Sequence, residues 1–141
     1  MSTNKLQSIL KISRHRELEA ARMIGQAQAR LQVSQETLEA LVNHKDSFGS
    51  KRLRCNAQSL LRERSFMSRL DHAIGTEKTR YSQLENDLED KLNIWREAHN
   101  RHQSLTKAHQ KIEKNDADRR IKVDQAETDD IVNVLRLHRR A

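Results

Sequence analysis

The chain lacks proline and has little glycine, cysteine or aromatic character. Its 141 residues include three glycines, one cysteine and four aromatic side chains, with 35% hydrophobic and 33% charged residues. So few apolar residues cannot surround a three-dimensional core, but they can line one stripe of a helix. Disordered chains of this polarity are usually rich in proline and glycine, so their scarcity here favours helix over disorder.

Other absences narrow the function and the compartment. A lone Cys55 excludes an internal disulfide framework and fits a reducing compartment. The N-terminal "MSTNKLQSIL" lacks the apolar region of a signal peptide, and no run of about 18 apolar residues occurs. Phosphate-loop, nucleophile-elbow and zinc motifs are missing as well. We therefore expect a soluble cytoplasmic protein that is not an enzyme, needs no cofactor and does not insert into the membrane.

Histidine and basic residues offer two weak site candidates. His99 and His102, with Glu97 nearby, resemble half of a metal site, but no further ligands are evident. We expect these histidines to be solvated and predict no metal site. The basic "KRLRC" at 51–55 could bind phosphates, yet Phe48 and Phe66 flank it rather than interleave with it. A nucleic-acid-binding coiled coil is therefore an alternative, and we predict no nucleic-acid partner.

The net charge of +7 is unevenly distributed. Basic residues outnumber acidic ones in segments 1–30 and 44–69, acidic residues prevail in 70–135, and three arginines lie in 136–140. If the middle of the chain is a bend, both ends of the resulting rod are basic. Positive ends suit nucleic acid, a membrane surface or an acidic protein site.

Heptad spacing of apolar residues predicts two helices, over about 4–47 and 57–139, joined by a bend at about 48–56. Gly49 is expected to end the first helix, and Ser50 or Asn56 to cap the second. The expected fold is all-α: one domain over 1–141, a two-helix antiparallel coiled-coil hairpin with a longer, overhanging C-terminal helix. The expected seam includes Ile24, Leu31, Leu38, Met67, Ile74, Tyr81, Leu84, Leu88 and Trp95.

A pivot near residue 51 would pair residue i with roughly residue 102 − i, so that Leu31 faces Leu70. The first helix would then end opposite residues 95–98, and everything after about 100 would lack a partner within the chain. The later seam positions include His102 and His109, which are poor residues to bury. A new apolar stripe then appears off the old register and requires another protein to cover it: Ile121, Val123, Ile131, Val134, Leu135 and Leu137.

Four segments resemble a known family. They are "AARMIG" (20–25), "ETLEALV" (36–42), "FMSRLDHAI" (66–74) and "WREAHNRHQSL" (95–105). In this order and spacing they are similar to the FliJ family of the bacterial flagellar type III export apparatus. The resemblance implies a coiled-coil stalk like that of rotary ATPases, working in flagellum assembly at the cytoplasmic face of the inner membrane.

The resemblance also implies partners. The termini would enter the hexameric export ATPase, FliI, the bend would reach the export gate protein, FlhA, and the family also escorts export chaperones. The protein would be a monomer on its own. The implied gate-facing residues are Leu41, His44, Phe48, Phe66, Leu70 and Ala73, with His44 standing where the family favours tyrosine. We predict that the ATPase is contacted by Arg14, Arg16, Arg136, Arg139 and Arg140.

Two further alternatives remain open. The first is a YscO-type stalk of a virulence type III secretion system, which would share the fold and the mechanism. The second is a generic structural coiled coil that dimerises in parallel with itself. Phe48 and Phe66 also have two readings: they could be exposed anchors for a partner, or they could pack against each other across the bend.

Overall fold

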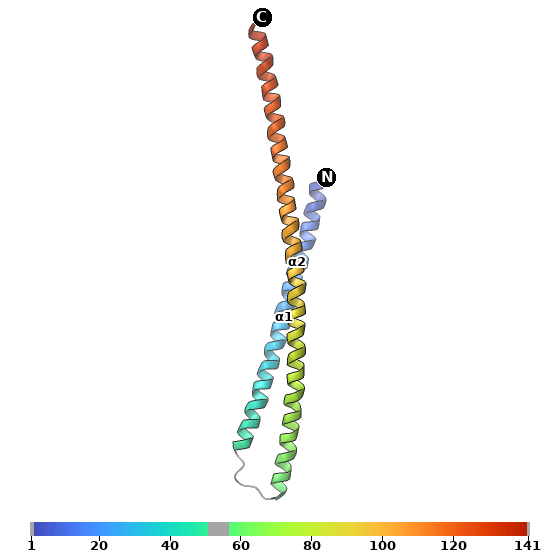
Figure 1. Ribbon diagram of the computed structural model, residues 1–141, viewed down its shortest axis with the longest axis vertical. Coiled ribbons are helices and arrows are strands. Elements are labelled where there is room, and N and C mark those ends of the chain that lie inside the picture. Colours follow the sequence, from blue (N-terminus) through green and yellow to red (C-terminus); the bar gives the residue numbers. More distant parts are fainter. Residues whose placement is uncertain (1, 51–56, 141) are drawn as a thin grey trace. The chain divides into compact units, whose positions relative to one another are not determined.

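The computed structural model describes residues 2–50 and 57–140, and all of them are helical (Figure 1). Helix α1 spans Ser2–Ser50 and helix α2 spans Ala57–Arg140. Both helices run without interruption because the chain has no proline and the apolar heptads continue from turn to turn. The predicted all-α class is confirmed. The chain divides into two units, residues 16–98 and residues 1–15 with 99–141.

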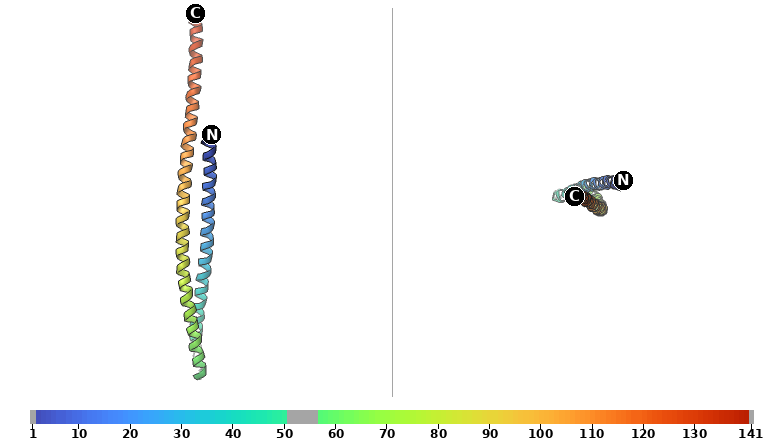
Figure 2. Two further views of the ribbon diagram at one scale, coloured as in Figure 1. Left: turned by 90° about the vertical axis from the view of Figure 1, so that its right-hand side faces the viewer. Right: turned by 90° about the horizontal axis from the view of Figure 1, so that it is seen from above.

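In the unit of residues 16–98, α1 and α2 lie side by side and run antiparallel (Figures 1 and 2). The contacts between them run in opposite order along the two helices: Ser34 bonds to Glu77, Lys45 pairs with Asp71, and Phe48 packs on Phe66. This is the antiparallel hairpin that the heptads predict.

The seam of this unit is narrow. Ala20, Ala27, Leu70 and Ile74 are its buried apolar residues. The other predicted seam residues are half-buried: Ile24, Leu31, Leu38, Met67, Tyr81, Leu84, Leu88 and Trp95. Small residues at alternate seam positions of α1 allow close approach of the two helices.

The pairing register differs from the sequence-based expectation. His44 and Phe48 contact Phe66, so Leu70 lies about level with the segment 41–45 and not with Leu31. The expected pivot at residue 51 was wrong by roughly a heptad or more. Heptads define the face that a helix buries but not its axial offset, since a slide by one heptad leaves the same faces in contact.

Gly49 does not end α1 at its own position. The helix includes it, and no glycine in the described residues has a positive φ. A helix tolerates glycine at a cost of about 1 kcal/mol, and the neighbouring Phe48 is held against α2. The proposed cap Asn56 lies outside the described residues, and Ser50 is the last residue of α1.

In the unit of residues 1–15 and 99–141, the start of α1 packs beside residues 102–109 of α2. Ser13 is buried and lies 2.7 Å, Oγ to Nδ1, from His102. Leu6, Leu10, Leu105 and His109 are half-buried, whereas every residue from Ala117 to Arg140 is exposed. Pairing within the chain therefore reaches past residue 100, which corrects the expected end of the overlap. The uncovered segment begins at about residue 113.

Candidate interaction surfaces

The first surface is an aromatic cluster at the end of the hairpin next to the bend. Its residues are His44 and Phe48 from α1 and Phe66 from α2. The Phe48 and Phe66 ring centroids lie 4.7 Å apart with the planes tilted at 51°, and His44 meets Phe66 edge-on at 5.9 Å. Heptad spacing places Phe48 seven residues after Leu41, so its side chain turns toward α2. The two phenylalanines pack on each other, as one of the two interpretations of the sequence predicted.

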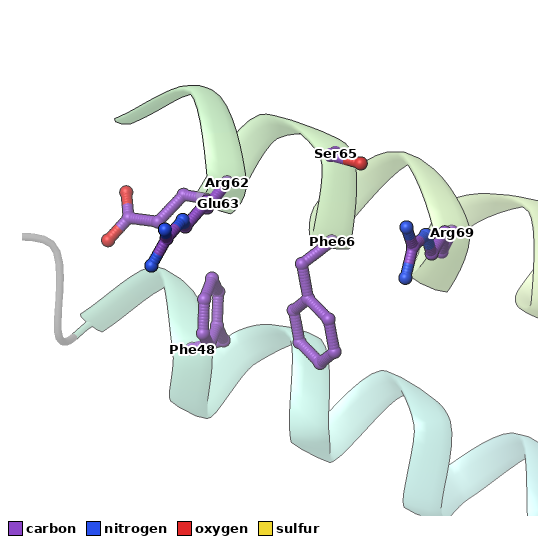
Figure 3. Close-up of a pocket in the computed structure, with 6 residues that line it drawn as sticks. All are labelled: Phe48, Arg62, Glu63, Ser65, Phe66 and Arg69. Atoms are coloured by element: carbon purple, nitrogen blue, oxygen red, sulfur yellow. The ribbon is translucent and has the colours of Figure 1, made fainter. Parts of the chain in front are cut away.

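The same rings border a hollow of about 370 Å³ (Figure 3). Phe48 and Phe66 supply its apolar wall, and both remain half-buried. Its polar lining comes from consecutive turns near the start of α2: Arg62, Glu63, Ser65 and Arg69. An apolar wall beside two arginines fits a side chain that is apolar at its tip and has acidic neighbours.

The other residues implied at this end differ in exposure. Leu41 and Ala73 are half-buried. Leu70 is only 7% exposed, so its side chain lies between the helices and supports the aromatic cluster from within. Leu70 therefore stabilises the surface rather than forming part of it.

The second surface is the basic end of α2. Arg136, Arg139 and Arg140 are exposed, and the last two, with His138, occupy the final turn. Cations there are favoured by the partial negative charge of the helix C-terminus. Arg14 and Arg16 are exposed near the start of α1.

The structure does not bring the two arginine groups together. Ser13 lies level with His102, so Arg14 is separated from Arg136 by about 50 Å along α2 at 1.5 Å per residue. Any single binding site that uses both groups must be long. Arg16 belongs to the other unit.

The apolar stripe beyond residue 116 lies uncovered on α2. Ile121, Ile131, Leu135 and Leu137 are 56%, 61%, 59% and 70% exposed. Val123 and Val134 are also exposed, as the sequence predicted, and Val132 adds a residue that the prediction omitted.

Polar residues inside the seam were missed by sequence reasoning. Ser34 is 2% exposed and its Oγ donates a hydrogen bond of 2.7 Å to Oε1 of Glu77. Both Ser13 and Ser34 fall on the heptad lattice of Ala20 and Ala27, which was the available signal. His102, expected to be solvated, is half-buried and bonded to Ser13. In the described residues no three side chains suited to metal binding come together.

Some charged side chains pair with neighbours on the same helix. On α1, Arg22 donates hydrogen bonds to Glu19, and this bonding raises the pKa of Arg22 above its ordinary value. His109 lies 3.4 Å from Glu113 one turn along α2. The pair of Arg22 and Glu19 is exposed, and solvent screens it, so it contributes little to stability. The His109 side chain is only 13% exposed and does not belong to the outer surface.

Comparison with known protein families identifies the family of the chain. A family model described as "Flagellar FliJ protein" matches residues 1–141. No curated protein matches the chain. Across the described residues, neither helix offers a stretch with the length and apolar character that crossing a bilayer requires.

Proposed function

The chain belongs to the FliJ family of flagellar proteins, and from this premise we propose that it is a non-enzymatic stalk of the type III export apparatus. One end of the stalk inserts into the hexameric export ATPase, and the other contacts the export gate protein. The chain acts as a single copy in that position, at the cytoplasmic face of the inner membrane. Export chaperones are further partners.

The observation that carries the proposal is the presence of two chemically different surfaces near opposite ends of α2. Phe66 of the aromatic cluster lies in the third turn of α2, whereas Arg139 and Arg140 lie in its last turn. The helix between them contains neither proline nor a break. A coupling element requires a stiff helix and a separate contact surface toward each end.

The proposed contact with the ATPase combines electrostatic attraction with the burial of apolar side chains. Arg136, Arg139 and Arg140 are exposed beside the bare apolar stripe, so this segment can bind an acidic ring with apolar patches. Such a protein performs no chemistry on ATP. It shifts the ATPase by binding more tightly to some subunit conformations than to others, which is the only way a ligand changes a conformational equilibrium.

ATP hydrolysis by the cognate export ATPase tests this contact. Replacing Arg136, Arg139 and Arg140 together by Glu should abolish stimulation, and adding Arg14→Glu and Arg16→Glu should not restore it. A control variant replaces the exposed Lys78, Lys107 and Lys111 of the same helix, which precede the bare segment, by Glu, and this changes the charge equally. Stimulation should survive in the control. Full stimulation by the arginine variant would reject the proposed contact.

The gate contact uses the aromatic cluster. Phe48→Ala with Phe66→Ala should weaken binding to the purified gate protein by at least tenfold, because partly exposed aromatic anchors dominate interfaces. The control is Leu18→Ala with Val33→Ala, which removes exposed apolar side chains elsewhere on α1. Unchanged gate binding by the double phenylalanine variant, with helicity preserved, would contradict the proposal.

The competing sequence interpretations are less well supported. The family match favours the flagellar apparatus over a YscO-type virulence stalk, and the identity of the bound ATPase separates the two. A parallel self-dimer over the hairpin does not account for Ser34–Glu77 and Phe48–Phe66, which join antiparallel helices of one chain.

A further inference from the structure

The bare end of α2 carries a coiled-coil pattern of its own. Ala117, Ile121, Asp124, Thr128, Ile131 and Leu135 alternate in spacings of four and three residues, as seam positions do. All six are exposed. The seam that faces α1 follows a different lattice, which includes His102 and His109; beyond the start of α1 the same lattice reaches Val123 and Leu137, which are exposed. The bare stripe lies off this lattice, and α1 does not cover it because Ser2 lies level with about residue 113.

The order of residue types along this stripe is nearly symmetric about Ala126. An antiparallel copy centred there sets Ile121 opposite Ile131 and Ala117 opposite Leu135. Asp124 of one copy meets Thr128 of the other, an uncharged residue whose hydroxyl donates a hydrogen bond of 2.8 Å to the Asp124 carbonyl oxygen of its own helix. A parallel copy would instead bring two Asp124 carboxylates together in the seam, which is unfavourable. We propose that segment 113–140 is a self-association surface on which a second copy of the chain binds antiparallel.

Charge limits the strength of this arrangement. Arg136 lies level with Asp116 of the second copy, and Arg139 lies level with Glu113, but the heptad positions of each pair are on opposite flanks of the seam, so these side chains do not meet. At the centre, Glu127 of the two copies would face each other, which opposes association. The dimer is therefore weak and reversible, since its apolar layers are few and the carboxylates at its centre repel each other.

The length of the uncovered segment of α2 also matches the overlap that the antiparallel pairing requires. Ser13 lies level with His102, so Ser2 lies level with about residue 113. An overlap centred on Ala126 brings Arg140 of the second copy level with Ile112, where the covering by α1 begins. The second copy thus fills the uncovered segment without displacing α1. The overlap is roughly 27 residues, or about 40 Å.

The association has a consequence that rests on the proposed function. The self-association surface includes the arginines assigned to the ATPase contact. A free pair of chains would then hide that segment, and the ATPase would separate the pair on binding.

Sedimentation equilibrium of the full chain tests the surface without any ATPase. The unaltered chain should show a concentration-dependent monomer–dimer equilibrium, and Ile121→Asp with Ile131→Asp should be monomeric throughout. Leu137→Asp is the control, since Leu137 belongs to the same exposed apolar surface but lies outside the six seam positions named above, and at 70% it is more exposed than Ile121 or Ile131; this variant should still dimerise. Glu127→Gln should tighten the dimer about two- to fivefold by removing the central repulsion. A monomeric unaltered chain, or equal losses in the stripe variant and the control, would overturn the proposal.

Disulfide trapping tests the orientation. In a Cys55→Ser background, one chain carries Ala117→Cys and a second, tagged for size, carries Leu135→Cys. Mixing and oxidation should join unlike chains, because Ala117 lies opposite Leu135 only in the antiparallel pair. Disulfides between like chains would indicate a parallel dimer, and the absence of disulfides would indicate no such pairing; either result contradicts the proposal. Because neither experiment involves the ATPase, their outcomes are separate from that of the proposed function.

Discussion

Removing the Ser34 hydroxyl should destabilise the hairpin measurably. Ser34 is 2% exposed and donates a hydrogen bond of 2.7 Å to the half-buried carboxylate of Glu77. A hydrogen bond to a charged group contributes roughly 1.5–3 kcal/mol, and water can replace part of it at a half-buried carboxylate. We expect Ser34→Ala to lower the free energy of unfolding by about 1–2 kcal/mol. The melting temperature should fall by about 3–6 °C.

Urea and thermal unfolding followed by circular dichroism measure this change. Adding Glu77→Leu to Ser34→Ala should recover the lost stability or exceed it, because an apolar pair can replace a buried polar one. Thr37→Ala is the control, since Thr37 is exposed on the same helix and bonds only to the Val33 carbonyl; its effect should stay within about 0.5 kcal/mol. Equal stabilities for Ser34→Ala and the unaltered chain would refute the assigned role of this polar layer.

Three further predictions concern the pairing of the helices. His102→Leu should strengthen the contact near Ser13 by replacing a polar seam residue, seen as slower hydrogen exchange in residues 4–15. Trp95→Ala should cost about 2–3 kcal/mol of unfolding free energy in urea titrations, because it removes a large half-buried seam side chain. A double-mutant cycle on Lys45 and Asp71 should give a coupling below about 1 kcal/mol, since both side chains are substantially exposed. Faster hydrogen exchange in His102→Leu would contradict the first prediction, and a negligible cost of Trp95→Ala the second. A larger coupling between Lys45 and Asp71 would contradict the third.

Heptad spacing was sufficient to predict the helices and the faces they bury, because burial along a coiled coil depends on periodicity. It placed Ile74 and Trp95 on the seam, where the structure has them. It could not give the axial offset, since heptads match themselves after every slide of seven residues. The offset is indicated instead by specific contacts such as Ser34–Glu77 and Phe48–Phe66.

The candidate surfaces were predictable to different degrees. Exposure of Ile131 and Leu135 followed from the lengths of the two helices, since the second helix extends past the first and has no partner there within the chain. The contact of Phe48 with Phe66 needed the register, so sequence left it open. His102 was misjudged because a polar side chain at a seam position can be buried when a small polar residue such as Ser13 faces it.

In the function proposed above, the bare segment after Ile112 acts on the ATPase and the paired helices hold the gate contact. The most direct measurement is ATP hydrolysis by the cognate export ATPase with the full chain and with a chain ending at residue 112. We expect stimulation by the full chain only, with gate binding and helical pairing kept by the shorter one. Equal stimulation by both chains would contradict it.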